Sequence, residues 1–241
     1  TADNGQIRLG DTTIMAGAVD ATLTGNLSAV SGAYDLSVRA SSRSPLSGDK
    51  VLDRLLAGDV NLSGRVTGGD HGAISLTNWR LKSRSLSVTL AGAIDETLDL
   101  AIKANLGNLT ELHQDLAGAA RIDAQVSGDR SAPLVKLSAT GENVTLVKAA
   151  LANPRLTADL KLSVDQPSGQ LDFSATLKNQ PVSAHARLVT TPQGTRELRE
   201  FSIAAGTAPI GSVLLRRSHP LVSSNQPECQ RNSRSGAQRL F

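Results

Sequence analysis

Apolar residues recur at every second position of this chain, segment after segment, over most of its length. Three clear runs are Leu98, Leu100, Ile102, Ala104 and Leu106; Leu156, Ala158, Leu160, Leu162 and Val164; and Leu171, Phe173, Ala175 and Leu177. Successive side chains of a β-strand point to opposite faces, so this period predicts strands that each present one apolar face. Because hardly any helical periodicity separates the runs, we predict an all-β chain whose long sheet is apolar on one side and polar on the other.

The apolar residues that would fill a core are small and evenly spread. Aromatic residues make up 2% of the chain, and the remaining apolar material is mostly Leu, Val, Ile and Ala. Compact globular domains draw much of their core from aromatic rings. The composition therefore favours a thin, elongated sheet over a thick core, and we predict that its strands pair in an antiparallel or mixed arrangement.

The charge distribution argues against a nucleic-acid partner. The net charge of +3 comes from arginines after residue 215, and the rest of the chain is close to neutral. Nucleic-acid binders gather basic residues on one face and often stack bases on aromatic rings. The sequence also lacks an apolar run of about 18 residues that could span a membrane. We expect the chain to be a fragment, with any membrane anchor or export signal upstream.

The chain repeats itself at intervals of roughly 60 residues, and each unit is expected to hold about four to six short strands. Residues 34–40 (YDLSVRA) resemble residues 98–104 (LDLAIKA), and Leu56-Ala57-Gly58 resembles Leu116-Ala117-Gly118. Such repetition is typical of stacked units that each cover part of their neighbour's apolar face. We predict a groove region over residues 1–208, with repeat units at roughly 1–68, 69–128 and 129–208.

Local signals predict the connections between strands. Turn sequences such as Lys178-Asn179-Gln180-Pro181 predict hairpins, and hence antiparallel neighbours. Two short helices are expected, one over Asp49–Ala57 and one after Asn108 through Leu109, Leu112 and Leu116, as plugs or edges on the sheet. Residues 209–241 are expected to form an irregular tail, disordered or non-native.

No catalytic or metal-binding constellation is found in the sequence. His71, His113, His185 and His219 are isolated from one another, and the carboxylate pair Asp95-Glu96 has the context of a turn. Nucleophile elbows, phosphate-binding loops and dinucleotide motifs are missing from the sequence. We expect no enzyme activity, no metal and no cofactor.

The apolar face is therefore the candidate functional surface. It could be a dry core closed on itself, as in a β-helix or a sandwich, or the floor of an open trough that holds acyl chains or an unfolded apolar strand. Periodicity alone leaves both open. The candidate floor residues are Leu98, Leu100, Ile102, Ile122, Val126, Leu160, Leu162, Phe173, Leu177 and Val182.

Several segments resemble a known family of repeats. They are residues 115–118 (DLAG), 126–128 (VSG), 132–137 (APLVKL), 156–160 (LTADL), 171–177 (LDFSATL) and 180–184 (QPVSA). In this order and spacing the chain resembles the TamB family of translocation and assembly module subunits, in the wider AsmA-like group. The resemblance covers about residues 1–208, and we place the chain in the middle or C-terminal repeat region of such a protein.

The resemblance implies a β-taco, an elongated folded-over sheet with an apolar groove. It implies a periplasmic segment anchored in the inner membrane of a Gram-negative bacterium, with an outer-membrane partner of the Omp85 type that is similar to TamA. Its implied cargo is phospholipid or unfolded outer-membrane protein, including autotransporters. The family has no catalytic residues to transfer.

The residues fit two other functions less well. A closed parallel β-helix, as in a surface adhesin or an autotransporter passenger, would need coils of near-constant length, whereas the spacing here is looser and includes hairpin signals. A polysaccharide-processing enzyme would need clustered carboxylates and aromatic platforms, which the sequence does not provide.

Overall fold

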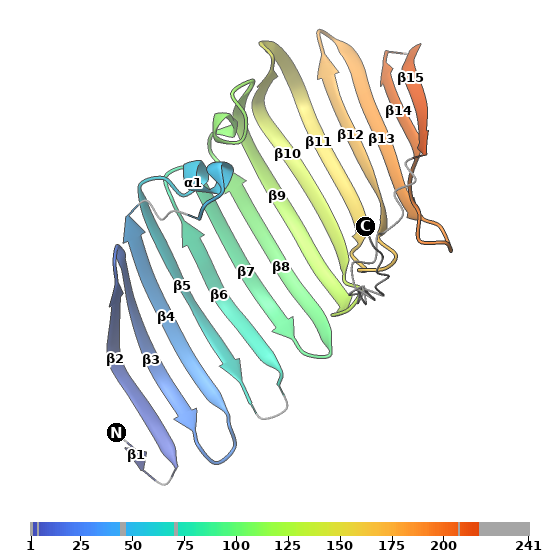
Figure 1. Ribbon diagram of the computed structural model, residues 1–241. Coiled ribbons are helices and arrows are strands. Elements are labelled where there is room, and N and C mark those ends of the chain that lie inside the picture. Colours follow the sequence, from blue (N-terminus) through green and yellow to red (C-terminus); the bar gives the residue numbers. More distant parts are fainter. Residues whose placement is uncertain (1, 4, 44–46, 70–71, 207, 217–241) are drawn as a thin grey trace, which may run out of the picture.

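The computed structural model describes residues 2–3, 5–43, 47–69, 72–206 and 208–216. Within these ranges, fifteen strands pair in sequence order into one antiparallel sheet (Figure 1). The strands are β1 (Ala2–Asp3), β2 (Gln6–Ala16), β3 (Val19–Ser28), β4 (Tyr34–Arg43), β5 (Asp59–Gly68), β6 (Ile74–Lys82), β7 (Leu86–Ile94), β8 (Thr97–Leu106), β9 (Leu116–Asp129), β10 (Leu134–Leu146), β11 (Ala149–Lys161), β12 (Ser168–Leu177), β13 (Gln180–Thr190), β14 (Arg196–Ala205) and β15 (Ala208–Arg216). The all-β prediction and the hairpin connections are confirmed.

The sheet is open, because its order begins at β1 and ends at β15 without those two strands pairing in the described part of the chain. All of its strand pairs there are antiparallel, so a closed parallel β-helix is wrong for this region. The hairpin turns between neighbouring strands explain why, since a parallel pair needs a much longer crossover.

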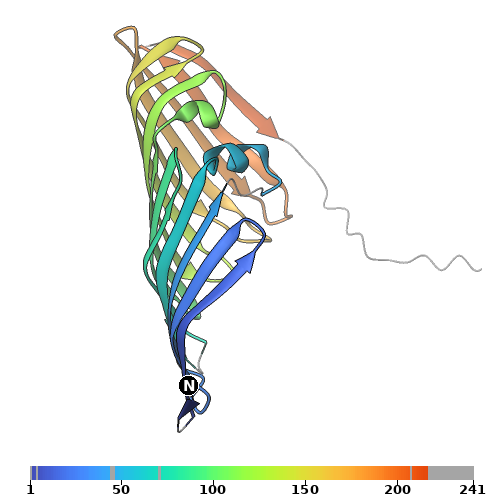
Figure 2. The same ribbon diagram turned by 90° about the vertical axis from the view of Figure 1, so that its left-hand side faces the viewer.

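Bulges curl this open sheet at regular intervals. The strands β2, β6, β10 and β14, which are four apart, each carry an extra residue relative to a neighbour, and β11 carries a further one. Asn78, Asn143, Asn153 and Glu200 take left-handed backbone conformations at four of these sites. Bulges bend a strand and increase its twist, and Figure 2 shows the resulting curved shape.

Two short helices lie at one edge of the sheet, here called the upper edge from its position in Figure 1. The helix α1 (Lys50–Leu55) connects β4 to β5, and the 3-10 helix η1 (Leu109–Glu111) connects β8 to β9. The side chain of Asp49 accepts from two amides of α1, and Asn108 caps η1. The sequence predicted the cap at Asn108, and it predicted a helix from Asp49 that ends two residues later than α1 does. The second helix is shorter than expected and Leu116 already begins β9, because so few residues cannot sustain an α-helix.

The sheet continues further toward the C-terminus than the sequence predicted. Strand β15 extends the sheet over Ala208–Arg216, which we had assigned to the irregular tail. Pro209 and Gly211 obscure the alternation there, and proline is tolerated in a strand at the edge of a sheet. Residues 217–241 lie outside the described residues. No helix in the described ranges has the length and apolarity required to cross a membrane.

The sheet has little core. No large side chain in the described part of the chain is less than 2% exposed. The buried hydrophobic cluster comprises Leu55, Leu106, Leu109 and Val144, at the upper edge, where α1 and η1 meet the strands. Elsewhere the two faces of a single layer carry the side chains, as the composition predicted.

Glycines allow strands to approach closely at points in the sheet, and this gives a test of the fold. Gly92 has φ 141°, and a Cβ atom built on it would collide with the carbonyl oxygen of Asp99 on β8. We expect Gly92→Ala to lower the free energy of unfolding by about 1–3 kcal/mol through backbone strain. Gly10→Ala is the control, because nothing lies within 4 Å of its Cβ position. Denaturant titration that finds the two variants equally stable would contradict the account.

An apolar face as the candidate functional site

Cross-strand pairing aligns the apolar residues into rows that run across the whole sheet. The first, the Leu100 row, contains Leu9, Gly25, Leu36, Val66, Leu76, Gly92, Leu100, Val126, Val135, Leu160, Gly169, Leu188 and Leu198. Each strand from β2 to β14 contributes one residue, and every residue is apolar or glycine. The pattern seen along single strands therefore continues from strand to strand.

A second row runs nearer the upper edge, separated from the first by the row that contains Ile102, Ala124 and Leu137. This Ile122 row contains Ile14, Ala21, Ala40, Leu62, Leu81, Val88, Ala104, Ile122, Ala139, Leu156, Phe173, Ala184 and Ile203. Again β2 to β14 each contribute one apolar side chain. Together the rows make a continuous apolar floor.

The floor is shielded but not sealed. On β8, Leu98, Leu100 and Ile102 are partly buried, while Asp99, Ala101 and Lys103, which alternate with them, are exposed. Every residue of the Leu100 row is partly buried. A core closed against a second layer would bury these residues fully. The apolar side is thus the inner side of an open, curved sheet (Figure 2).

The structure places all ten candidate floor residues on or beside this face. Nine of them are partly buried, and none of the nine is fully covered. Leu162 lies just beyond the end of β11, where its amide donates to the carbonyl of Pro133 and its side chain is 49% exposed at the rim. Their participation in binding stays a prediction.

Sequence reasoning missed much of the floor. It named no residue of β2 to β7 and none of β10, although Leu36, Leu76 and Val135 all lie in the Leu100 row. The alternation on those strands was visible in the sequence. What was missing was the register, which alone shows that the rows continue across the sheet.

The two rows of the floor contain no polar side chain that could anchor a ligand. The nearby aromatic rings pack over glycines of the sheet. The indole of Trp79 lies over Gly64, where an added Cβ would collide with it, and the ring of Tyr34 lies over Gly68 in the same way. The Trp79 Nε1 donates to the carbonyl of Arg65 at 3.0 Å, so its polar atom is already paired. Backbone groups of the strands pair within the sheet. Such a floor can recognise a ligand only through apolar contact.

The opposite face is polar and carries paired charges. Arg65 on β5 binds the carboxylate of Asp35 on β4 with two nitrogens, and this hydrogen bonding lowers the pKa of Asp35. Lys103 and Asp123 pair across β8 and β9 at 4.0 Å. Exposed pairs of this kind contribute little to stability. They keep the face hydrated and balance its charge.

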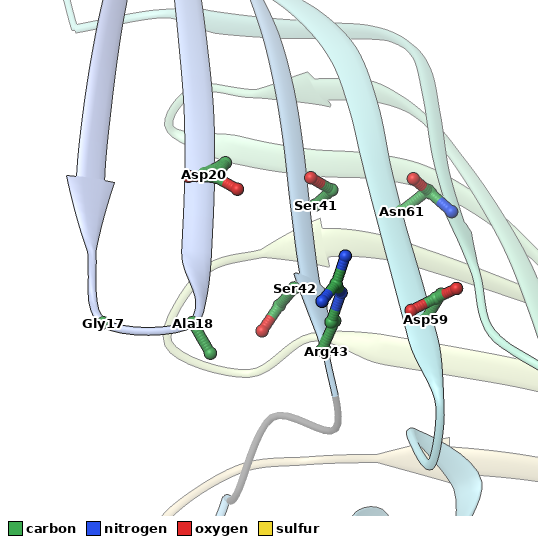
Figure 3. A pocket seen from close by; sticks show the side chains of 8 residues that line it. All are labelled: Gly17, Ala18, Asp20, Ser41, Ser42, Arg43, Asp59 and Asn61. Atoms are coloured by element: carbon green, nitrogen blue, oxygen red, sulfur yellow. The ribbon is translucent and has the colours of Figure 1, made fainter.

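A hollow of about 590 Å³ lies at the upper edge, beside the β2–β3 turn (Figure 3). Polar side chains dominate its lining, with Asp20, Ser41 and Asn61 in one cross-strand row and Arg43 opposite Asp59. Neither a histidine nor a cysteine contributes to it. In the described part of the chain, moreover, no group of three or more His, Cys, Asp and Glu side chains could hold a metal ion.

His185 on β13 joins three strands of the polar face. Its Nδ1 lies 2.6 Å from Oδ1 of Asp172 on β12, and its Nε2 lies 3.7 Å from Oε2 of Glu200 on β14. Hydrogen bonding to Asp172 raises the pKa of His185 above 6.5, partial burial opposes this, and Glu200 adds a smaller favourable effect. The imidazolium form therefore favours the pairing of these strands.

Comparison with family models supports the resemblance to TamB. The family model described as the N-terminal domain of TamB matches residues 46–216, which is more than half of the chain. We had placed the chain in the middle or C-terminal repeats, whereas the matching model describes an N-terminal domain. A pattern that repeats along a protein does not reveal which copy is present. No curated protein and no solved structure matches the chain.

The His185 contacts predict a pH dependence of stability. Because the pKa of His185 is raised in the folded chain, its stabilisation is complete below about pH 6.5 and is lost as the pH rises through the folded-state value. We expect the stability difference between the wild type and His185→Gln to shrink from about pH 5.5 to about pH 8.5. Asp172→Asn should abolish most of that dependence. A difference that stays constant over this range would contradict the assignment.

Proposed function

The chain belongs to the TamB family, and we propose that it is a segment of a non-enzymatic scaffold whose apolar floor carries hydrophobic cargo across the Gram-negative periplasm. The single observation that supports this best is the pair of uninterrupted apolar rows over thirteen strands of an open sheet. Membership in a family of the Gram-negative envelope supports the location. The upstream inner-membrane anchor belongs to the proposal.

Acyl chains fit the floor better than an unfolded polypeptide does. A polypeptide laid across the strands would bury backbone N–H and C=O groups, each of which needs a hydrogen-bond partner. The rows around Leu100 and Ile122 offer none, because their side chains are apolar and the strand backbones are paired with each other. A methylene chain has no such requirement. We therefore propose phospholipid acyl chains as the cargo.

The chemistry of the floor also supports movement along it. Burial of each methylene is worth about 0.8 kcal/mol, and the rows present Leu, Val, Ile, Ala or Gly, with Phe173 on β12, at each step from β2 to β14. Because no polar side chain in the rows binds one position more strongly than the next, a chain can exchange contacts with a small barrier. The driving force and direction of movement would come from the membranes at either end.

The proposed partner is an outer-membrane protein of the Omp85 type, similar to TamA. Family membership supports this coarse role in a translocation and assembly module. In this proposal, the outer-membrane partner assembles or secretes outer-membrane proteins, including autotransporters. It does so either by itself or with the phospholipid that the scaffold delivers. A pull-down of the full-length protein with its envelope partners would fail to recover an Omp85-type protein if this part of the proposal were wrong.

A charge placed on the floor tests the cargo site. Leu137 on β10 lies in the floor beside the Leu100 row, and Ser138 next to it is exposed on the polar face. We expect native mass spectrometry to find phospholipid on the wild type and on Ser138→Glu, and to find little on Leu137→Glu, because the carboxylate would oppose an apolar guest. Equal lipid content in both variants, or a wild type that carries none, would count against the proposal.

Acyl length provides a second, quantitative test. Two extra methylenes that are fully buried should add about 1.6 kcal/mol of binding free energy, or about a fifteenfold gain in affinity. We expect lysophosphatidylcholine with 14 carbons to bind the wild type roughly tenfold more tightly than the 12-carbon form, since burial on an open floor is incomplete. Affinities that do not depend on chain length would show that the head group, and not the floor, binds.

A further inference from the structure

The helix α1 covers a part of the apolar face that is distant from its own neighbours in the chain. It connects β4 to β5, yet its Leu55 packs with Leu106 of β8 and Leu109 of η1 in the buried cluster. Val51 of α1 and Leu86 of β7 pack against the same cluster. Figure 2 shows α1 and η1 together on the inner side of the curved sheet.

The two helices close a third apolar row. This Leu106 row runs one step nearer the upper edge than the Ile122 row and contains Leu86, Leu106 and Ala120 as cross-strand partners. The side chain of Leu106 is 6% exposed, and Leu109 of η1 above it is 7% exposed. Leu86 and Ala120 pack against the cluster and stay partly buried, as the Leu100 row is, so Leu106 is the residue of this row that the helices seal. Access to the floor therefore ends where the helices begin.

Polar contacts hold this cover in a defined position. The Ser83 hydroxyl, in the turn between β6 and β7, donates to the carbonyl of Leu55 at 2.5 Å. The guanidinium of Arg54 donates to the carbonyl of Leu112 at 3.2 Å. At the other end of α1, the carboxylate of Asp49 accepts from Val51 at 2.8 Å. Bonds at both ends of α1 are typical of a fixed element and not of a free flap.

We propose that α1 and η1 form a fixed stop, which confines the acyl chains of a guest to the Leu100 and Ile122 rows and excludes them from the Leu106 row. The inference rests on the proposed lipid function. Leu55 and Leu109 are the residues that set this boundary, because they occupy the place that methylenes would otherwise take on Leu86 and Leu106.

A photoactivatable lipid maps the boundary directly. The full-length protein is loaded with phosphatidylglycerol that carries diazirines along its acyl chains, irradiated, and digested for mass spectrometry. In the wild type we expect adducts on the Leu100 row, for example at Leu100 and Val126, and none at the buried Leu106. Adducts at Leu106 in the wild type would overturn the stop.

Two variants of the same helix complete the test. Leu55→Asp should unseat α1 and produce adducts at Leu106 at the level of Leu100. Leu52→Asp is the matched control, because Leu52 is 47% exposed on the same helix, and its adduct map should equal that of the wild type.

The outcomes separate this inference from the proposed function. Unchanged labelling of the Leu100 row shows that Leu55→Asp still folds and binds, and in that case no gain at Leu106 overturns the stop. A wild type that gives no adducts anywhere overturns the proposed lipid function, and the stop with it.

Discussion

Hydrogen bonding between antiparallel neighbours holds this protein together, and almost everything else in the structure follows from that constraint. Each strand satisfies its backbone groups against the strands before and after it, in strict sequence order. The two edges of the sheet do not meet within the described residues, so no second layer covers the apolar face. Globular domains bury their apolar residues in a core, but in the described part of this chain the buried cluster is small and lies around Leu55 and Leu106. The remaining apolar surface is where we propose that a guest binds.

The curvature of the sheet reduces the exposure of its apolar face to water. Bulges on every fourth strand, together with glycines such as Gly25 and Gly92 that permit close approach, bend the sheet so that its apolar side lies within. Neighbouring side chains then shield one another without a covering layer. The polar face needs no such device, because its ion pairs, such as Arg65 with Asp35, are hydrated. The same bending that protects the floor from water shapes it for an elongated apolar ligand.

The sequence predicted what short-range chemistry determines. Alternation from Leu98 to Leu106 defined β8 and its apolar side, and Asp49 correctly marked the start of α1. Apolar residues on β6 are separated by three positions, and not two, between Leu76 and Trp79. This break in the alternation could have predicted the bulge at Asn78. Contacts between distant segments were beyond such reasoning. Neither the packing of Leu55 on Leu106 nor the open edges could be inferred, since both depend on how the whole sheet curls.

The most direct test asks which side of β8 meets the guest. Ile102 and Lys103 are adjacent in sequence, but Ile102 is on the apolar face and Lys103 is exposed on the polar one. A benzophenone amino acid placed at each position of the full-length protein, and irradiated in living cells, reports contact with lipid. The account predicts that phospholipid is captured at Ile102 and not at Lys103. Capture at Lys103 alone, or at neither position, would contradict an open apolar floor.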